Sequence, residues 1–304
     1  MKKINELEKI SPFKKFLMKN LSNLILDKST RDSIRIAFLN LGFKETIKKI
    51  SKINKEKEQG DFKNFLSIIL VIKNEAMYLK EWLEFYLLQG VDHFYIYDNE
   101  SSDNIKEVLQ PYIEKGLVTY DLFVGRSNNI QSQVYNEAIE KYKNETKWFA
   151  PLDTDEFAYA PNYKSLAEYL KDNEKYNQIV MKWWIYGNSG HETKPEGLVI
   201  ENFTMREKTS CGTPKSFVKG LKVLHMLVHK HSVVGKTKYP PIEEIRCNHY
   251  FGKSVEEYRT KKMLRGAING SSLDLSLYND MNRNEVYDPI PEAIIEKVKA
   301  NVML

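Results

Sequence analysis

Apolar residues follow one another along the chain in blocks that predict strands and helices in alternation. Residues 66–72 form an apolar run rich in β-branched side chains, which predicts a buried strand. From Leu79 onward, apolar residues recur at i, i+4, i+7 and i+8, which predicts a helix that ends at Gly90. The main domain therefore begins with a strand followed by a helix.

The same alternation continues as far as the acidic residues near position 153. Further strands are predicted at residues 93–97, 117–123 and 148–152. The helices between them are predicted at residues 105–109, closed before Pro111, and at 131–142. A β-α-β-α-β-α-β order is typical of an α/β fold with a mostly parallel sheet flanked by helices.

Polar clusters follow three of the predicted strands. They occupy residues 73–75, 98–103 and 153–156. Ligands of open α/β sheets bind outside the carboxyl ends of the strands, so these clusters predict a binding site. No glycine-rich motif follows the first strand, which argues against a Rossmann dinucleotide site and a P-loop.

The third cluster carries the candidate chemistry. Asp153, Asp155 and Glu156 follow an apolar strand directly. Carboxylates at such a position need a cation or hydrogen-bond donors. Asp153 and Asp155 are hard oxygen ligands suited to Mg²⁺ or Mn²⁺, and the metal's remaining positions would suit a diphosphate. A solvated acidic turn is the alternative, because short motifs often match by chance.

The second half of the chain is less regular. A helix is predicted at 164–171, a strand at 178–186, and mixed strands and long loops over 192–245. After the segment 245–250, Ser254 and Glu257 form a capping box that starts a helix over 255–266.

We divide the chain into a basic helical extension at 1–60, a main domain at 61–270 and a C-terminal tail at 271–304. Residues 1–58 hold 15 Lys and Arg against 7 Asp and Glu, which gives this segment a charge of +8. The whole chain has a net charge of +5, so the remainder carries −3. Apolar residues recur there at helical spacing, as at Phe13, Phe16 and Leu17. Such a segment either packs on the main domain or lies on an anionic membrane surface.

Composition removes several classes of protein. Two cysteines, Cys211 and Cys247, provide neither a disulfide framework nor metal-finger spacing. We find no apolar run long enough for a membrane span and no signal-peptide pattern. We expect a cytoplasmic protein, with peripheral contact to the inner face of the membrane as an option through residues 1–58.

Five motifs in order resemble glycosyltransferase family 92 and its bacterial relatives near family 2. The motifs are Lys73-Asn74-Glu75-Ala76, Tyr95-Ile96-Tyr97-Asp98-Asn99, Gln131 with Tyr135-Asn136, Asp153-Thr154-Asp155-Glu156-Phe157, and Asn248-His249-Tyr250 with Lys253-Ser254. The resemblance covers residues 65–266. It implies a GT-A fold, a nucleotide-sugar donor, Mn²⁺ or Mg²⁺, and transfer to a glycan or lipid-linked acceptor in surface polysaccharide synthesis.

The resemblance also assigns residues. Asp155 would ligate the metal, Asp153 would reach the ribose or the metal shell, and His249 would complete the metal site. Asp98 would receive the nucleobase, although a turn-capping role explains it equally well. The remaining donor-site candidates are Lys73, Asn74, Glu75, Gln131, Asn136 and Lys253. Gln131 and Asn136 suit a plain helix surface nearly as well.

Lys253 and Arg265, which flank the capped helix, are candidates for contact with the diphosphate. An inverting reaction needs a carboxylate base, and Glu192 and Glu196 are the candidates. A retaining reaction needs none, and both outcomes stay open. A carboxylate at Asp98 would accept the N–H of uracil but not the bare ring nitrogen of cytosine, which favours a UDP-sugar.

Two other functions remain as alternatives. A metal-dependent phosphodiesterase or nuclease would need further ligands, and the candidates are His225, His229 and His231, with the last two on one strand face. A membrane-binding module could rest on the basic extension but leaves the acidic strand ends unexplained. We expect no nucleic-acid partner. Trp183, Trp184 and Tyr186 could stack on a sugar or simply fill a buried strand.

Overall fold

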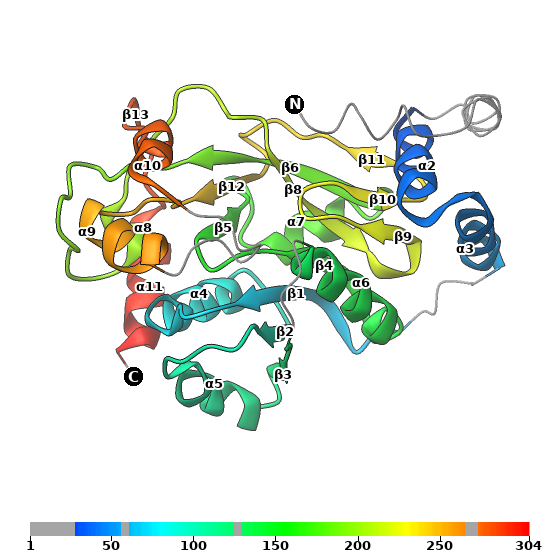
Figure 1. Ribbon diagram of the computed structural model, residues 1–304, viewed down its shortest axis with the longest axis horizontal. Coiled ribbons are helices and arrows are strands. Elements are labelled where there is room, and N and C mark those ends of the chain that lie inside the picture. The colour runs from blue at the N-terminus through cyan, green and yellow to red at the C-terminus, as the bar shows by residue number, and fades with distance from the viewer. Residues whose placement is uncertain (1–27, 56–60, 125–128, 265–272, 304) are drawn as a thin grey trace.

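A computed structural model describes residues 28–55, 61–124, 129–264 and 273–303 (Figure 1). Within this part of the chain the main feature is one nine-stranded sheet with helices packed on it. The expected α/β class, with a mostly parallel sheet and a helical N-terminal extension, is confirmed.

The first half of the sheet is entirely parallel. Its strands lie in the order β3-β2-β1-β4. They are β1 (Asn64–Ile72), β2 (His93–Asp98), β3 (Val118–Leu122) and β4 (Thr146–Pro151). The connecting helices are α4 (Ala76–Leu88), α5 (Ile105–Glu114) and α6 (Ile130–Tyr142). Every strand therefore directs its carboxyl end to the same edge, as the sequence pattern predicts.

The second half of the sheet is mixed. The order continues from β4 through β8 (Pro214–Lys219), β6 (Gln178–Ile185) and β12 (Arg246–His249) to β5 (Glu156–Tyr159), with β11 (Thr237–Lys238) paired to β6. Only four residues separate β4 from β5, although three strands lie between them in the sheet. Four strand spacings across a flat sheet would measure about 19 Å. The link spans at most about 17 Å. The sheet must therefore curl, and the link lies where its two halves meet.

The side chains of β1 show why this sheet is covered on both faces. Leu66, Ile68 and Leu70 enter the larger apolar core, which includes residues of α4, whereas Ile69 and Val71 enter a second core with α6. Successive side chains of a strand point to opposite faces, so an unbroken apolar run demands cover on each face.

The remaining elements are short or lie at the periphery. They are α7 (Leu166–Asp172), α8 (Val199–Asn202), β7 (Met205–Arg206), η2 (Gly220–Lys222), β9 (Val223–Met226), β10 (His231–Val233), α9 (Val255–Glu257), η3 (Tyr258–Met263), α10 (Leu275–Met281), β13 (Val286–Tyr287) and α11 (Glu292–Val302). No helix in the described residues is long and apolar enough to cross a membrane.

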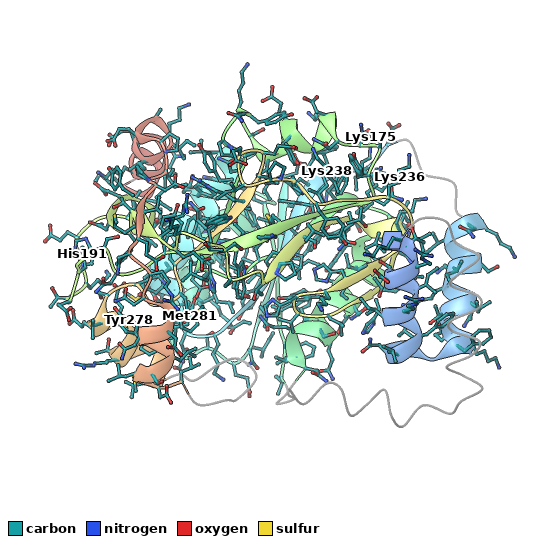
Figure 2. The ribbon with its side chains drawn as sticks, turned by 90° about the horizontal axis from the view of Figure 1, so that it is seen from above. Lys175, His191, Lys236, Lys238, Tyr278 and Met281 are labelled. Carbon is teal, nitrogen blue, oxygen red and sulfur yellow. The ribbon has the colours of Figure 1, made fainter. Side chains whose placement is uncertain are left out.

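In the described part of the N-terminal extension, α2 (Lys28–Leu41) and α3 (Phe43–Lys55) pack beside the β9–β10 hairpin. A small apolar cluster, with Phe38 and Ile53 from the helices and Leu224 from β9, joins them. The pair forms one end of the molecule (Figures 1 and 2). The predicted apolar positions Phe13, Phe16 and Leu17 lie outside the described residues.

Three segments differ from the sequence prediction. Helix α5 continues through Pro111 to Glu114, because Leu109 and Tyr112 are buried in the main core on either side of the proline. The capping box at Ser254 is present, but α9 has one turn and passes into a π-helix, η3, over Tyr258–Met263. The expected C-terminal tail contains α10 and α11, and α11 packs on α4 through apolar residues such as Ile295.

Candidate active site

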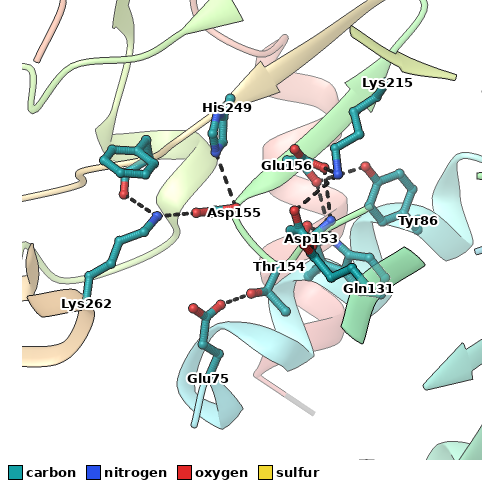
Figure 3. Close-up of polar contacts among 12 residues, drawn as sticks. Glu75, Tyr86, Gln131, Asp153, Thr154, Asp155, Glu156, Lys215, His249 and Lys262 are labelled. Carbon is teal, nitrogen blue, oxygen red and sulfur yellow. Dashed lines mark hydrogen bonds and ion pairs between the residues drawn. The ribbon is translucent and has the colours of Figure 1, made fainter. Parts of the chain in front are cut away.

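The link between β4 and β5 is a tight turn that helix α4 holds in place (Figure 3). The Trp82 indole N–H lies 2.9 Å from the carbonyl oxygen of Asp153 and 3.2 Å from that of Glu156. The Tyr86 hydroxyl donates to the same Glu156 carbonyl at 2.9 Å and accepts the Ala158 N–H at 2.7 Å. Buried donors thus fix the backbone on which the acidic side chains stand.

A cavity of about 180 Å³ opens over this turn. Its polar and aromatic lining comes from seven separate segments of the chain: Lys73, Glu75, Gln131, Asp153, Thr154, Asp155, Trp183, His229, His249 and Lys262. The carboxyl ends of β1, β4, β6 and β12 therefore supply or adjoin its walls. This is the position in which α/β sheets bind ligands.

Asp155 lies between a histidine and a lysine. Its Oδ1 is 3.5 Å from Nε2 of His249, and its Oδ2 is 2.5 Å from Nζ of Lys262 (Figure 3). Burial by itself would raise the pKa of Asp155, but the Lys262 ammonium and then His249 hold that pKa well below its usual range. Burial lowers the pKa of His249, although Asp155 opposes this change. Asp155 is therefore an anion beside a neutral imidazole at pH 7.

Asp153 lies on the other side of the turn. Its Oδ1 accepts the Gln131 amide N–H at 3.0 Å, and its Oδ2 is 3.1 Å from Nζ of Lys215. The Lys215 side chain is fully buried on β8 and also lies 3.0 Å from Oε2 of Glu156. That Glu156 oxygen accepts the backbone N–H of Asp153 at 3.0 Å. One buried lysine thus joins two carboxylates of the turn.

Burial and charge oppose each other in this buried group. Burial raises the pKa of Glu156 to about 8, although Lys215 opposes the rise. Burial would lower the pKa of Lys215, but Asp153 and Glu156 raise it well above its usual range. Lys215 is therefore an ammonium ion that fixes the orientation of Asp153. It was not predicted from the sequence, because a lone lysine in a polar-flanked strand carries no local signal.

The donor set around Asp155 fits a divalent ion. Two ligands, each about 2.1 Å from one ion, lie about 3.0 Å apart at a right angle and farther apart at wider angles. The 3.5 Å between Asp155 Oδ1 and His249 Nε2 agrees with such a pair and is too long for a good hydrogen bond. Nδ1 of His249 is buried without a hydrogen-bond partner. Two protein ligands suffice for Mg²⁺ or Mn²⁺, whose other ligands are water and phosphate.

Most of the predicted donor residues adjoin this cavity. Lys73, Glu75 and Gln131 line it directly, and the Thr154 hydroxyl donates to the Glu75 carboxylate. Lys253 lines a small neighbouring cavity, with its ammonium 4.0 Å from the centre of the Tyr78 ring. Asn74 accepts the Ser102 N–H at 2.7 Å and so joins the loops after β1 and β2.

Two predicted donor residues have other hydrogen-bond partners in the structure. Oδ1 of Asp98 accepts the Ser101 N–H at 2.9 Å and Oδ2 accepts the Tyr120 hydroxyl at 2.7 Å, so this carboxylate caps the turn, and it is not among the residues that line the cavity. The Asn136 amide bonds both the N–H and the C=O of Met226, at 3.0 and 2.8 Å, and lies outside the site cavity. Asp98 thus pairs with a turn N–H and a tyrosine hydroxyl, and Asn136 pairs with a backbone segment 90 residues away, which resemblance does not reveal.

Glu192 and Glu196, the candidate bases, do not line the cavity. Both are exposed on the loop after β6, where their backbone carbonyls accept the Glu256 N–H and the Asn202 amide. Their assignment as bases is therefore not supported by the geometry. Arg265 lies outside the described residues.

Lys262 and His229 line the cavity although the sequence did not place them in the donor site, and Trp183, for which sugar stacking and burial were both open, lines it as well. Lys262 reaches Asp155 from η3, and its ammonium also donates to the Phe251 carbonyl at 2.7 Å. The Trp183 ring lies 4.1 Å from the His249 ring and 5.0 Å from the His229 ring, centre to centre. In the sequence, Trp183 lies in an apolar strand and His229 lies between two short strands. Both positions are equally typical of side chains that only pack in the core, so neither position indicates a binding site.

The phosphodiesterase alternative finds no support in the described segments. His229 lies in the turn of the β9–β10 hairpin, and only this member of the histidine group reaches the cavity. No group of three or more His, Cys, Asp and Glu within those segments could hold a metal ion. A two-metal site would need more ligands than these.

Comparison with known proteins assigns most of the chain to one protein family. The family model described as glycosyltransferase family 92 matches residues 69–286. A glycosyltransferase family 92 protein of Ricinus communis is 27% identical over 164 residues, which cover 50% of this chain and 28% of that protein. Galactan beta-1,4-galactosyltransferase GALS3 of Arabidopsis thaliana is 27% identical over 199 residues, which cover 60% of this chain and 39% of that protein.

Among solved structures, that of S. aureus TarS 1–349 in complex with UDP matches with a TM-score of 0.34 and 16% identity, over 51% of this chain and 47% of that one. The chain thus spans less than half the length of each of these proteins.

Proposed function

The chain belongs to glycosyltransferase family 92, and from this premise we propose that it transfers a sugar from a nucleotide-sugar donor to a glycan or glycolipid acceptor. The curled, mostly parallel sheet agrees with the GT-A fold that the family resemblance implies. By resemblance, Asp153 and Asp155 match the acidic motif of the family.

One observation carries the proposal. A buried anion, Asp155, and a neutral imidazole, His249, converge at 3.5 Å on a cavity at the carboxyl edge of the sheet. A carboxylate in an apolar setting is costly to maintain unless it meets a cation. A structural role would be served by Lys262 alone, whereas the histidine adds a second donor suited to a metal.

We propose that Asp155 and His249 hold Mn²⁺ or Mg²⁺, with Asp153 at the edge of the metal shell or at the ribose. When bound, the metal would supply Lewis-acid stabilisation of the charge that develops on the leaving diphosphate. Gln131 and Lys215 orient Asp153, since both of its oxygens are already bonded. The Trp82 indole N–H donates to the Asp153 carbonyl oxygen and so fixes the backbone of the turn that carries both carboxylates.

Lys262 and Lys73 line the same cavity and are the proposed cationic contacts of the diphosphate. As the bond from the anomeric carbon to the phosphate oxygen breaks, negative charge grows on the diphosphate. Fixed ammonium groups in a cavity with restricted water stabilise that charge more than in bulk solvent. Lys262 is well placed, because its position 2.5 Å from Asp155 places an ammonium beside the proposed metal.

We propose a UDP-sugar donor, with UDP-galactose as the first compound to test. Support comes from the relatives named galactan beta-1,4-galactosyltransferase, which act on a polysaccharide acceptor by name. A role in surface polysaccharide synthesis is proposed on the same ground. Asp98 no longer supports the nucleotide choice, since it caps a turn.

A thermal-shift screen of UDP-, GDP-, CDP- and CMP-sugars, with and without Mn²⁺, tests the proposal. A donor at a hundred times its dissociation constant stabilises the fold by about 2.7 kcal/mol. We expect a shift with one donor that depends on Mn²⁺, and release of the free nucleotide when acceptor or water is present. If no nucleotide sugar shifts the transition with or without Mn²⁺, the proposed function is wrong.

A further inference from the structure

Helix α3 has two faces of different character. The inner face packs against the β9–β10 hairpin through Ile53 and the Lys49 ammonium, which donates to the Leu224 carbonyl at 3.0 Å. The outer face carries Phe43, Lys44, Ile47, Lys48, Ser51, Asn54 and Lys55, all of them exposed. We call these seven residues the outer face of α3. The helix is thus already anchored by its inner face. Phe43 of the outer face also stacks on Phe38 of α2, with the ring centres 5.3 Å apart, and remains partly exposed.

This outer face combines apolar and basic side chains. Phe43 is 39% exposed and Ile47 is 43% exposed, and they lie one helical turn apart. The basic residues Lys44, Lys48 and Lys55 lie beside them on the helical wheel. The one acidic residue of α3, Glu45, lies 3.9 Å from Lys48, and both line a cavity that residues of α6 also line.

Exposed apolar residues are concentrated here. Among the described residues ten large hydrophobic side chains are exposed, and Leu39, Phe43 and Ile47 are three of them within nine positions. A scattered exposed hydrophobe needs no explanation, but a group framed by lysines does.

The charge of the chain is also polarised toward this end. Helices α2 and α3 contain eight Lys and Arg against two Asp and Glu, whereas the chain beyond residue 58 carries −3. An anionic surface therefore attracts the α2–α3 end and repels the body, which orients the molecule on approach. In Figures 1 and 2 these helices form one end of the described molecule, clear of the sheet.

We propose that the outer face of α3 docks on an anionic lipid bilayer, with Phe43 and Ile47 entering the headgroup boundary and Lys44, Lys48 and Lys55 contacting acidic headgroups. An interfacial helix needs an apolar strip and flanking lysines on one face, and this helix has both. Each lysine near such a surface contributes about 1 kcal/mol, which is roughly fivefold in the partition coefficient at low salt. The helix has no long apolar stripe, so the attachment is reversible.

Vesicle flotation of the full chain tests this proposal, with vesicles of phosphatidylcholine alone and of phosphatidylcholine with about one third phosphatidylserine. We expect recovery with the anionic vesicles only, declining as salt is raised. The variant Lys44→Gln/Lys48→Gln/Lys55→Gln should lower the partition coefficient at least about tenfold. The matched control, Lys115→Gln/Lys164→Gln/Lys194→Gln, removes the same charge from exposed lysines elsewhere and should retain binding.

The apolar part has its own pair of variants. Ile47→Asn should weaken binding severalfold, whereas Leu122→Asn, which changes an exposed leucine on β3, should not. Equal recovery with both kinds of vesicle, equal loss in both lysine variants, or binding that is lost only when residues 1–27 are removed would each overturn the proposal. So would light scattering that shows a wild-type dimer which Ile47→Asn converts to a monomer, because the face would then bind a second copy.

Discussion

Nζ of Lys262 lies 2.5 Å from Oδ2 of Asp155, while the opposite oxygen of the same carboxylate faces His249. A protein cation and the proposed metal position thus share one aspartate. The lysine neutralises Asp155 in the metal-free site, and in the proposed function it would also contact the diphosphate of the donor. This arrangement makes two opposite predictions for one substitution.

Lys262→Met should raise the affinity for Mn²⁺ alone about tenfold, or about 1.4 kcal/mol, because a competing cation is removed from Asp155. It should lower the affinity for the nucleotide diphosphate in the presence of Mn²⁺, because a contact to the phosphate is lost. Calorimetry measures both values. Lys261→Met, the exposed neighbour, is the control. Unchanged Mn²⁺ affinity in Lys262→Met would contradict the prediction.

Asp155→Asn should reduce donor turnover by about a thousandfold, or about 4 kcal/mol, since the amide cannot replace the anion that holds the metal. Circular dichroism should show an unchanged fold, because the amide keeps the shape of the carboxylate. Asp172→Asn, an exposed change at the end of α7, serves as the control. Turnover at the wild-type rate in Asp155→Asn would contradict the assignment of Asp155 as a metal ligand.

At pH 9, above the pKa of about 8 that burial gives Glu156, Lys215→Met should destabilise the fold by about 3–5 kcal/mol, because it leaves the buried Glu156 and the partly exposed Asp153 without their shared cation. Adding Glu156→Gln should recover part of this loss, since the second change removes one of those carboxylates. Urea unfolding of the two single variants and the double variant measures the coupling. Strictly additive effects would show that Lys215 and Glu156 do not stabilise each other.

Asp98→Asn should leave the affinity for UDP within about twofold, because Asp98 serves the turn at Ser101 and the Tyr120 hydroxyl. Asp98→Ala should instead lower stability by about 1–2 kcal/mol through the unpaired N–H and hydroxyl. Titrations of UDP, CDP and GDP with Mn²⁺ then compare the nucleotides. A large loss of UDP affinity in Asp98→Asn, with stability intact, would restore the base-binding role.

Glu81 makes stability depend on pH. Burial raises its pKa to about 7, although two N–H groups at the start of α8 oppose the rise by donating to it. Because the folded pKa lies above the unfolded value, its contribution is complete below about pH 4.5 and is lost as pH rises through 7. The loss amounts to at most about 3 kcal/mol.

Glu81→Gln removes this titration, so the variant should gain stability relative to the wild type between pH 5 and pH 8. Urea unfolding across that range measures the difference. Glu107→Gln, an exposed change on α5, is the control. A difference between Glu81→Gln and the wild type that stays constant with pH would contradict the assignment.

The sequence by itself determined the order of strands and helices and the edge at which the site lies. The apolar period is a local property, and β1, β2 and β4 begin or end within a few residues of their predicted limits. It also predicted that Asp153, Asp155 and His249 belong together, because their motifs occur in the order of a known family.

Only the tertiary structure decided which side chains complete the site. Lys215 and Lys262 are 62 and 107 residues from their carboxylate partners, so no local pattern connects them. The curl of the sheet brings β8, β12 and η3 to one turn, and burial then requires that each carboxylate meet a cation. Asp98 and Asn136 show that the tertiary structure can also give a predicted site residue another role. In the folded chain their side chains form hydrogen bonds with other protein groups.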